Sequence, residues 1–246
     1  ANSNIIINGG SVSFNDNSMT GTSTITNNAT LNLSSAELSP GATIINNVGG
    51  QININTLAEV GSISGAGDIT LTNDLSVGTL DQNDTISGVI DGAGRLTTVG
   101  TEILTLSGAN TYTGGTTFTG GTLSVDNDGN LGDVAGDLIF DSGTLRTLTS
   151  FASARSVSVD VAGGTINTDG NDITLSGVIA DGGGGAGEFI KDGDGTLTLS
   201  GVNTYSGGMR IRREKVAVTN DDSIGTGDLT FDGAGTTLQA AGAGLT

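Results

Sequence analysis

The amino-acid sequence predicts an all-β fold, a β-solenoid in which short parallel strands stack coil upon coil. Three observations lead to this prediction. Apolar and polar residues alternate over short segments, Gly, Asn and Asp separate these segments, and a long block of sequence occurs twice. Helical periodicity is nearly absent. If one coil takes roughly 20 residues, the chain forms roughly a dozen coils.

The predicted strands are short segments in which Leu, Ile or Val face inward while Thr, Ser and Asn face water. A β-sandwich is typical of longer strands around a larger aromatic core, whereas this chain has six Phe, two Tyr and no Trp. Gly and Asn at the corners supply the positive φ angles that tight turns need. The clearest strand segments are residues 52–55, 68–71, 104–106, 123–125, 157–161 and 197–199.

The composition excludes several kinds of site. The chain has no His and no Cys, so a Ser-His-Asp triad, a Cys-His pair, a disulfide and a His-based zinc site cannot form within it. The 26 acidic and 8 basic residues give a net charge of -18, which argues against binding to nucleic acid or to an anionic membrane. No apolar run is long enough for a membrane-spanning helix, so we expect no transmembrane segment.

The repeated block identifies the positions that define each module. LTLSGANTYTGG (residues 104–115) and LTLSGVNTYSGG (residues 197–208) differ only where Ala and Thr become Val and Ser. Repetition favours a packing or corner role over catalysis for the shared residues. These signature residues are Asn110, Tyr112, Gly114 and Gly115 in the first copy and Asn203, Tyr205, Gly207 and Gly208 in the second.

The repeat also divides the chain. We expect one elongated β-helix over residues 1–246, with Asn/Thr/Ser-rich coils in residues 1–82. A first repeat module then occupies residues 83–170, and a second occupies residues 171–246.

These motifs resemble a known family. SGVIDGAGRLTTVGTEILTLSGANTYTGGTTFTGGTLSV (residues 87–125) closely resembles the passenger-associated transport repeat of bacterial autotransporters, and residues 176–218 resemble it too. The resemblance implies a right-handed parallel β-helix, export across the outer membrane to the cell surface or medium, and a C-terminal outer-membrane β-barrel translocator in the full-length protein. It further implies a non-catalytic stalk, cleaved or excerpted from that protein, that supports secretion and presents adhesive regions.

One segment departs from the acidic character of the chain. GGMRIRREKVAV (residues 207–218) holds four of the eight basic residues, Arg210, Arg212, Arg213 and Lys215. Its alignment with GGTTFTGGTLSV (residues 114–125) keeps the apolar positions inward, so the basic residues lie on an outward face. We favour the interpretation that they offset acidic residues of neighbouring coils, such as Asp221 and Asp222.

The alternative is a basic strip through which an adhesin binds an anionic glycan, a lipopolysaccharide phosphate or an acidic protein of a host or neighbouring cell. Polysaccharide lyase chemistry is a third, disfavoured possibility. The same alignment replaces the Gly120-Gly121 corner by Arg213-Glu214. This pair must form a different turn or accept a left-handed backbone conformation.

Acidic clusters such as residues 126–129 and 192–195 match neither the calcium-binding nonapeptide repeat nor the EF-hand. Turn formation is the favoured explanation, with adventitious calcium at acidic turns as the alternative. Acid pairs could serve glycoside hydrolysis, yet no Trp is present as a sugar platform. We therefore expect no cofactor, no metal site and no catalytic residues.

Overall fold

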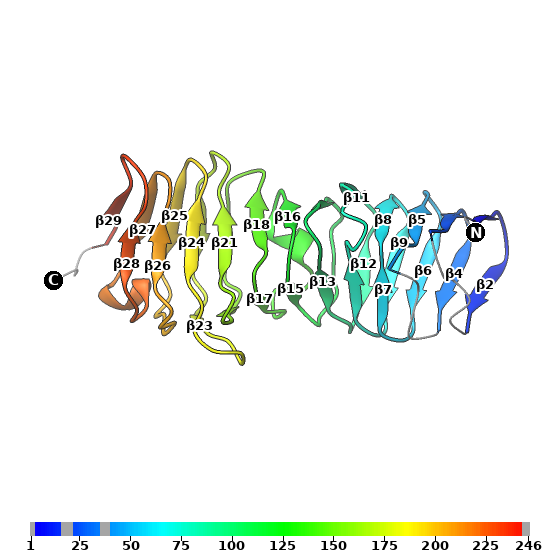
Figure 1. Ribbon diagram of the computed structural model, residues 1–246, viewed down its shortest axis with the longest axis horizontal. Helices are drawn as coiled ribbons and strands as arrows, with labels where there is room; N and C mark the ends of the chain where they lie inside the picture. Colours follow the sequence, from blue (N-terminus) through cyan, green and yellow to red (C-terminus); the bar gives the residue numbers. More distant parts are fainter. Residues whose placement is uncertain (1–2, 16–21, 35–39, 243–246) are drawn as a thin grey trace. The chain divides into compact units, whose positions relative to one another are not determined.

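The computed structural model describes residues 3–15, 22–34 and 40–242. The chain divides into two compact units. The first unit comprises residues 1–116 and 129–136, and the second unit comprises residues 117–128 and 137–246. In each unit, short strands lie side by side in parallel sheets (Figure 1).

Three sheets surround the core of the first unit, and neighbouring strands within each sheet pair in parallel. Its longest sheet contains, in order, β1 (Asn4–Ile7), β3 (Thr24–Asn27), β5 (Thr43–Asn46), β8 (Ser62–Gly65), β11 (Asp84–Ile86) and β14 (Ile103–Leu106). The second sheet contains β2 (Ser11–Phe14), β4 (Thr30–Leu33), β6 (Gln51–Ile54), β9 (Asp68–Leu71) and β12 (Ile90–Gly92). The third contains β7 (Ala58–Val60), β10 (Leu75–Val77) and β13 (Leu96–Thr98).

The second unit has the same construction. Its longest sheet contains β16 (Thr122–Val125), β18 (Thr144–Thr147), β21 (Gly164–Asn167), β24 (Phe189–Asp192), β26 (Met209–Ile211) and β28 (Leu229–Phe231). The other sheets contain β17 (Leu138–Phe140), β20 (Val157–Val159) and β23 (Ile179–Asp181), and β19 (Phe151–Ser153), β22 (Ile173–Leu175), β25 (Thr196–Leu199), β27 (Lys215–Val218) and β29 (Thr237–Ala240). The remaining elements are β15 (Thr116–Phe118) and the 3-10 helices η1 (Asp128–Leu131) and η2 (Asp221–Ile224).

This architecture confirms the predicted all-β solenoid of stacked parallel strands. Six strands stack in the longest described sheet of each unit, which agrees with the predicted number of coils. The right-handed sense of the coil and the division at residues 82 and 170 stay predictions. The alternating segments also became strands, with two differences in length. Residues 52–55 were expected to be one strand, but β6 ends at Ile54 and leaves Asn55 outside. Residues 157–161 were expected to be one strand, but β20 ends at Val159 because Asp160 begins a turn closed by a hydrogen bond from Gly163 N–H to its carbonyl at 2.7 Å.

The core consists of columns in which each apolar side chain lies over its counterpart in the next coil. In the first unit, Ile25 pairs in register with Ile44, and Ile44 pairs with Ile63, and all three are fully buried. Burial of such side chains contributes about 25 cal/mol per Å² of apolar surface. The alternation of the sequence therefore sets which residues enter the core, and the register sets which residues meet there.

Polar side chains form columns as well. Buried Asn27 donates its side-chain amide to the side-chain carbonyl of Asn46 at 2.9 Å, and Asn46 donates in turn to the backbone carbonyl of Asp68 at 3.0 Å. A buried amide is costly unless its hydrogen bonds are made. Stacking identical residues at successive turns satisfies that requirement and fixes the register of the coils.

Aromatic rings fill part of the core of the second unit. Phe118 and Phe140 stack at 4.5 Å between ring centroids, and Phe189 meets Phe140 edge-on at 6.0 Å. All three rings are fully buried. The few aromatic residues of the chain thus concentrate where they stabilise one another.

We expect Phe140→Ala to lower the free energy of unfolding of the second unit by about 3–5 kcal/mol, because it leaves a cavity between two aromatic neighbours. Urea unfolding followed by circular dichroism measures this change. Val161→Ala is the control, since Val161 is 66% exposed and its truncation should change stability by less than about 0.5 kcal/mol. Equal effects of the two substitutions would contradict the role given to the ring stack.

Candidate functional site

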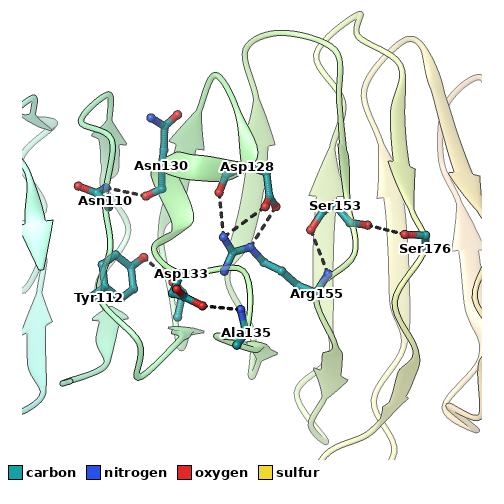
Figure 2. Close-up of polar contacts among 10 residues, drawn as sticks. Asn110, Tyr112, Asp128, Asn130, Asp133, Ala135, Ser153, Arg155 and Ser176 are labelled. Carbon is teal, nitrogen blue, oxygen red and sulfur yellow. Dashed lines mark hydrogen bonds and ion pairs between the residues drawn. The ribbon is translucent and has the colours of Figure 1, made fainter. Parts of the chain in front are cut away.

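The signature Asn of the first repeat joins three successive coils. The side-chain carbonyl of Asn110 accepts a hydrogen bond from Ile90 N–H at 2.8 Å, and its amide donates to the backbone carbonyl of Asn130 at 2.6 Å. Asn110 is buried, and Figure 2 shows it facing Asn130. Because both bonds link different turns of the solenoid, this side chain holds the stack together.

The second repeat reproduces the arrangement. The side-chain carbonyl of buried Asn203 accepts from Ile179 N–H at 2.8 Å, and its amide donates to the backbone carbonyl of Ser223. In each repeat the last acceptor lies in a 3-10 helix, η1 or η2. The sequence analysis did not predict these helices, and it treated residues 126–129, which overlap η1, as a turn.

The signature tyrosines are fully buried at equivalent places, but their hydroxyl partners differ. The Tyr112 hydroxyl lies 2.7 Å from Thr116 Oγ1, whereas the Tyr205 hydroxyl donates to Met209 Sδ at 3.5 Å. Thioether sulfur is a weak acceptor. Burial raises the pKa of Tyr205, so its phenol stays neutral and acts as a packing group.

The signature glycines serve backbone geometry. Gly115 and Gly208 have φ angles of 79° and 90°, a region that side-chain-bearing residues rarely adopt. A Cβ atom at Gly114 would lie 2.4 Å from the carbonyl carbon of Gly94, which no real contact permits. A Cβ atom at Gly207 would meet the preceding coil in the same way. All eight signature residues thus lie at contacts between coils or at corners.

The basic residues of the 207–218 segment do not form one free surface. Arg210 lies on β26, where its guanidinium contacts Glu188 at 2.8 Å and Asp232 at 3.3 Å. These acids belong to the preceding and following coils. Arg210 therefore offsets acidic residues of both neighbours, although Asp221 and Asp222, the acids expected from the sequence, lie in η2.

Arg213 and Glu214 lie at the corner between β26 and β27. Arg213 contacts Asp192 at 3.4 Å and lines a cleft of about 290 Å³ whose other charged groups are all carboxylates. Glu214 has a φ of 52°, so the corner keeps a left-handed residue although glycine has been lost. Of the two expected outcomes, a different turn or a left-handed backbone, the structure has the second. Glu214 accepts the strain that Gly121, at φ 61°, avoids.

The remaining basic residues of the strip are less engaged. Arg212 is exposed, and Lys215 is partly exposed at the start of β27. Carboxylates already contact two of the four basic side chains, which reduces the positive charge available to an anionic ligand. Binding of such a ligand by Arg210, Arg212, Arg213 and Lys215 stays a prediction.

Lys191, a basic residue outside the 207–218 segment, is buried, and the sequence analysis did not predict this. It lies on β24 in register with Ile166 and Ile211, within an otherwise apolar column. Its amine donates to the backbone carbonyls of Gly193 at 2.6 Å and Asp192 at 3.1 Å. Burial lowers the pKa of this amine to about 8, against the opposing effect of nearby carboxylates. The alternation of β24 could have revealed it, because Lys191 has the same parity as buried Phe189.

Two buried acids in the first unit also escaped prediction. Asp84 lies on β11 in register with Leu104 and accepts a hydrogen bond from Ser62 at 2.9 Å. Burial raises its pKa. Glu102, just before β14, is buried too, and burial together with the negative charges of Asp84 and Asp81 raises the pKa of Glu102 to about 7.

A buried ion pair lies in the second unit. Arg155 Nε contacts the carboxylate of Asp128 at 3.0 Å, and its terminal nitrogen donates to the backbone carbonyl of the same residue at 3.0 Å (Figure 2). The arginine side chain is fully buried. Such a pair is held by several hydrogen bonds, so removal of one partner would leave a charge buried alone. Nothing in the sequence around either residue indicated this pairing.

The described residues contain no group of three or more His, Cys, Asp or Glu side chains arranged to hold a metal ion. Within the same residues, no helix has the length and apolar character needed to cross a membrane.

Comparisons with known proteins agree with the resemblance noted in the sequence. The family model for the passenger-associated-transport-repeat matches residues 96–125 and 189–213. The chain is 37% identical over 147 residues to a protein of Brucella suis biovar 1 (strain 1330) named "Adhesin BmaC autotransporter". That alignment covers 58% of this chain and 4% of the relative, so the chain spans a small part of that protein. No solved structure matches the chain.

We expect Asn110→Ala to lower the free energy of unfolding by about 2–4 kcal/mol, because it leaves the Ile90 N–H and the Asn130 carbonyl unsatisfied inside the core. Urea unfolding is the measurement. Asn55→Ala is the matched control, since Asn55 is exposed and makes a single long bond to Ser34. The role of Asn110 is refuted if the two variants lose equal stability.

The stability of the second unit should rise between pH 8 and about 10, by up to about 1.4 kcal/mol per pH unit. The reason is that the folded protein releases the Lys191 proton near pH 8, whereas the unfolded chain keeps it until about 10.5. Below pH 8 both states are protonated and Lys191 gives no slope. Urea unfolding at a series of pH values measures the effect.

Lys191→Met should remove this rise, whereas Lys215→Met should retain it because Lys215 is partly exposed. An unchanged rise in Lys191→Met would show that another group causes it.

Proposed function

We propose that this chain acts as a non-catalytic stalk at the bacterial cell surface. The basis is its character as an autotransporter passenger-like segment with passenger-associated transport repeats. In this role it supports secretion through a C-terminal outer-membrane translocator and presents adhesive regions beyond the cell. The match of the repeat model to both copies and the similarity to a protein named as an autotransporter adhesin support the proposal.

The observation that carries the proposal is the tie made by each signature Asn between three successive coils. A coil that emerges outside the membrane can pair with the exposed strand edges of the coil already folded. It can also form the side-chain hydrogen bonds of the signature Asn. Strand pairing, apolar columns and these side-chain bonds then all form against the coil already in place. Folding can thus propagate along the chain without an internal energy source and can favour its movement outward.

The composition and the arrangement of side chains support a non-catalytic role. Glycoside hydrolysis needs two carboxyl groups across an accessible sugar site. The buried acids described above face backbone and core rather than a cleft. The acidic cleft beside Arg213 has no aromatic side chain in its lining.

The test uses the full-length protein displayed on bacteria, with Asn110→Ala and Asn203→Ala combined. We expect severalfold less protease-accessible passenger at the surface, with the translocator inserted in normal amount, because propagation of folding stalls at both repeats. The readout is immunoblotting of the surface-released passenger against the translocator.

The control combines Asn55→Ala with Thr198→Ala, which changes exposed or outward-facing positions only. Normal display by the double Asn variant, together with its measured loss of stability, would refute the proposed role of the repeats in secretion.

A further inference from the structure

The turn that precedes β14 brings several oxygen atoms close to the backbone of Gly100. A Cβ atom placed on Gly100 would lie 2.2 Å from the carbonyl oxygen of Gly78, 2.8 Å from Asp81 Oδ1 and 3.0 Å from Glu102 Oε2. Three oxygens from two successive coils therefore converge beside one glycine. A side chain at position 100 would clash with them. Asp81 Oδ1 also accepts hydrogen bonds from Thr101 N–H at 2.6 Å and from Thr101 Oγ1 at 2.9 Å.

A second glycine, Gly78, packs directly against the other oxygen of the same carboxylate. A Cβ atom on Gly78 would lie 1.7 Å from Glu102 Oε1 and 2.4 Å from the carbonyl oxygen of Val99. Both oxygens of Glu102 thus lie close to backbone carbonyls or to another carboxylate. These neighbours are hydrogen-bond acceptors, and none of them can donate a proton to Glu102.

The carboxylate of Glu102 is buried, and the hydrogen-bond donor that acts on it is its own backbone N–H. Glu102 is 5% exposed, and its Oε2 atom has no hydrogen-bond partner. The charged groups that act on it are Asp84 and Asp81, both acidic. Asp84 is 8% exposed, and its Oδ2 atom also lacks a partner. A buried charge needs a counter-charge or a metal ion, and among the residues that the structure describes no basic side chain acts on Glu102.

We propose that this turn is a binding site for a hard divalent cation, in particular Ca²⁺, held by the carboxylates of Asp81 and Glu102 and by the carbonyl oxygen of Gly78. Oxygen-only donors, two carboxylates and a backbone carbonyl are the ligands that calcium uses in proteins, with water completing its coordination. Since the ligands come from two successive coils, the ion fastens one coil to the next in the first unit.

The site belongs to the first repeat alone. The offset of 93 residues between the repeats places Gly195 at the position of Glu102 and Gly193 at the position of Gly100. In the second repeat, the buried amine of Lys191 lies at the corresponding turn and donates to its carbonyls. A divalent cation in the first repeat and a lysine in the second satisfy the oxygen-rich turn in two chemically different ways.

The test is isothermal titration calorimetry of CaCl₂ into the whole chain at mildly alkaline pH, at constant ionic strength. Thermal unfolding in the same solutions provides a second readout. We expect saturable binding with a dissociation constant on the order of 10⁻⁴ to 10⁻³ M, as in extracellular calcium modules. The unfolding temperature should rise with calcium over the same range.

Glu102→Gln should weaken this binding at least about tenfold, because calcium affinity depends on the number of charged ligands. The variant should fold well and be more stable than the wild type in the absence of calcium, since it no longer buries a charge. Glu59→Gln is the matched control, because Glu59 is an exposed residue of β7 and its substitution changes the net charge by the same amount. It should bind calcium like the wild type.

The proposal is overturned by absence of saturable heat in the wild type, or by equal calcium responses in Glu102→Gln and the wild type. The second result would mean that calcium only screens the net charge of -18. Equal heats and equal stabilisation with MgCl₂ would likewise refute a site selective for calcium.

Discussion

Everything in this molecule depends on the parallel register that places each residue over its counterpart in the adjacent coil. In a globular core, a side chain meets partners from unrelated parts of the sequence. Here Ile44 meets Ile25 and Ile63, and Asn27 meets Asn46, because the same position recurs at each turn. A single rule therefore governs both the apolar columns and the polar ones, and each coil is complete only when both neighbours are in place.

That rule explains how much the sequence could predict. Alternation identified strands such as β9 and β25, and the repeat identified Asn110 and Asn203 as equivalent residues. Alternation reports which face a residue occupies, which is a local property. The end of β20 at Val159 was missed because a turn bond at Asp160 competes with strand pairing, and sequence alternation contains no sign of that competition.

The buried charges show a different limit. Lys191 and Asp84 both have inward parity, yet their charge suggests the surface. What decides their place is a set of backbone carbonyls or a Ser hydroxyl from another coil, which only the three-dimensional register reveals. The same holds for the pair of Arg155 with Asp128, since 27 residues separate the partners. The basic residues of the strip are exposed or partly exposed, but the carboxylates that contact two of them are not the expected Asp221 and Asp222. They are Glu188, Asp232 and Asp192, whose side chains the three-dimensional register brings near.

The 3-10 helices that follow the repeats have a consequence for how such chains change in length. Each helix supplies the backbone carbonyl that completes the signature Asn of the coil before it, at a separation of 20 residues in both copies. An insertion or deletion of part of a turn would move that carbonyl away from its Asn and shift every column beyond it. Gain or loss of complete turns leaves the stacking intact, so evolution can lengthen or shorten this protein only in steps of a whole turn.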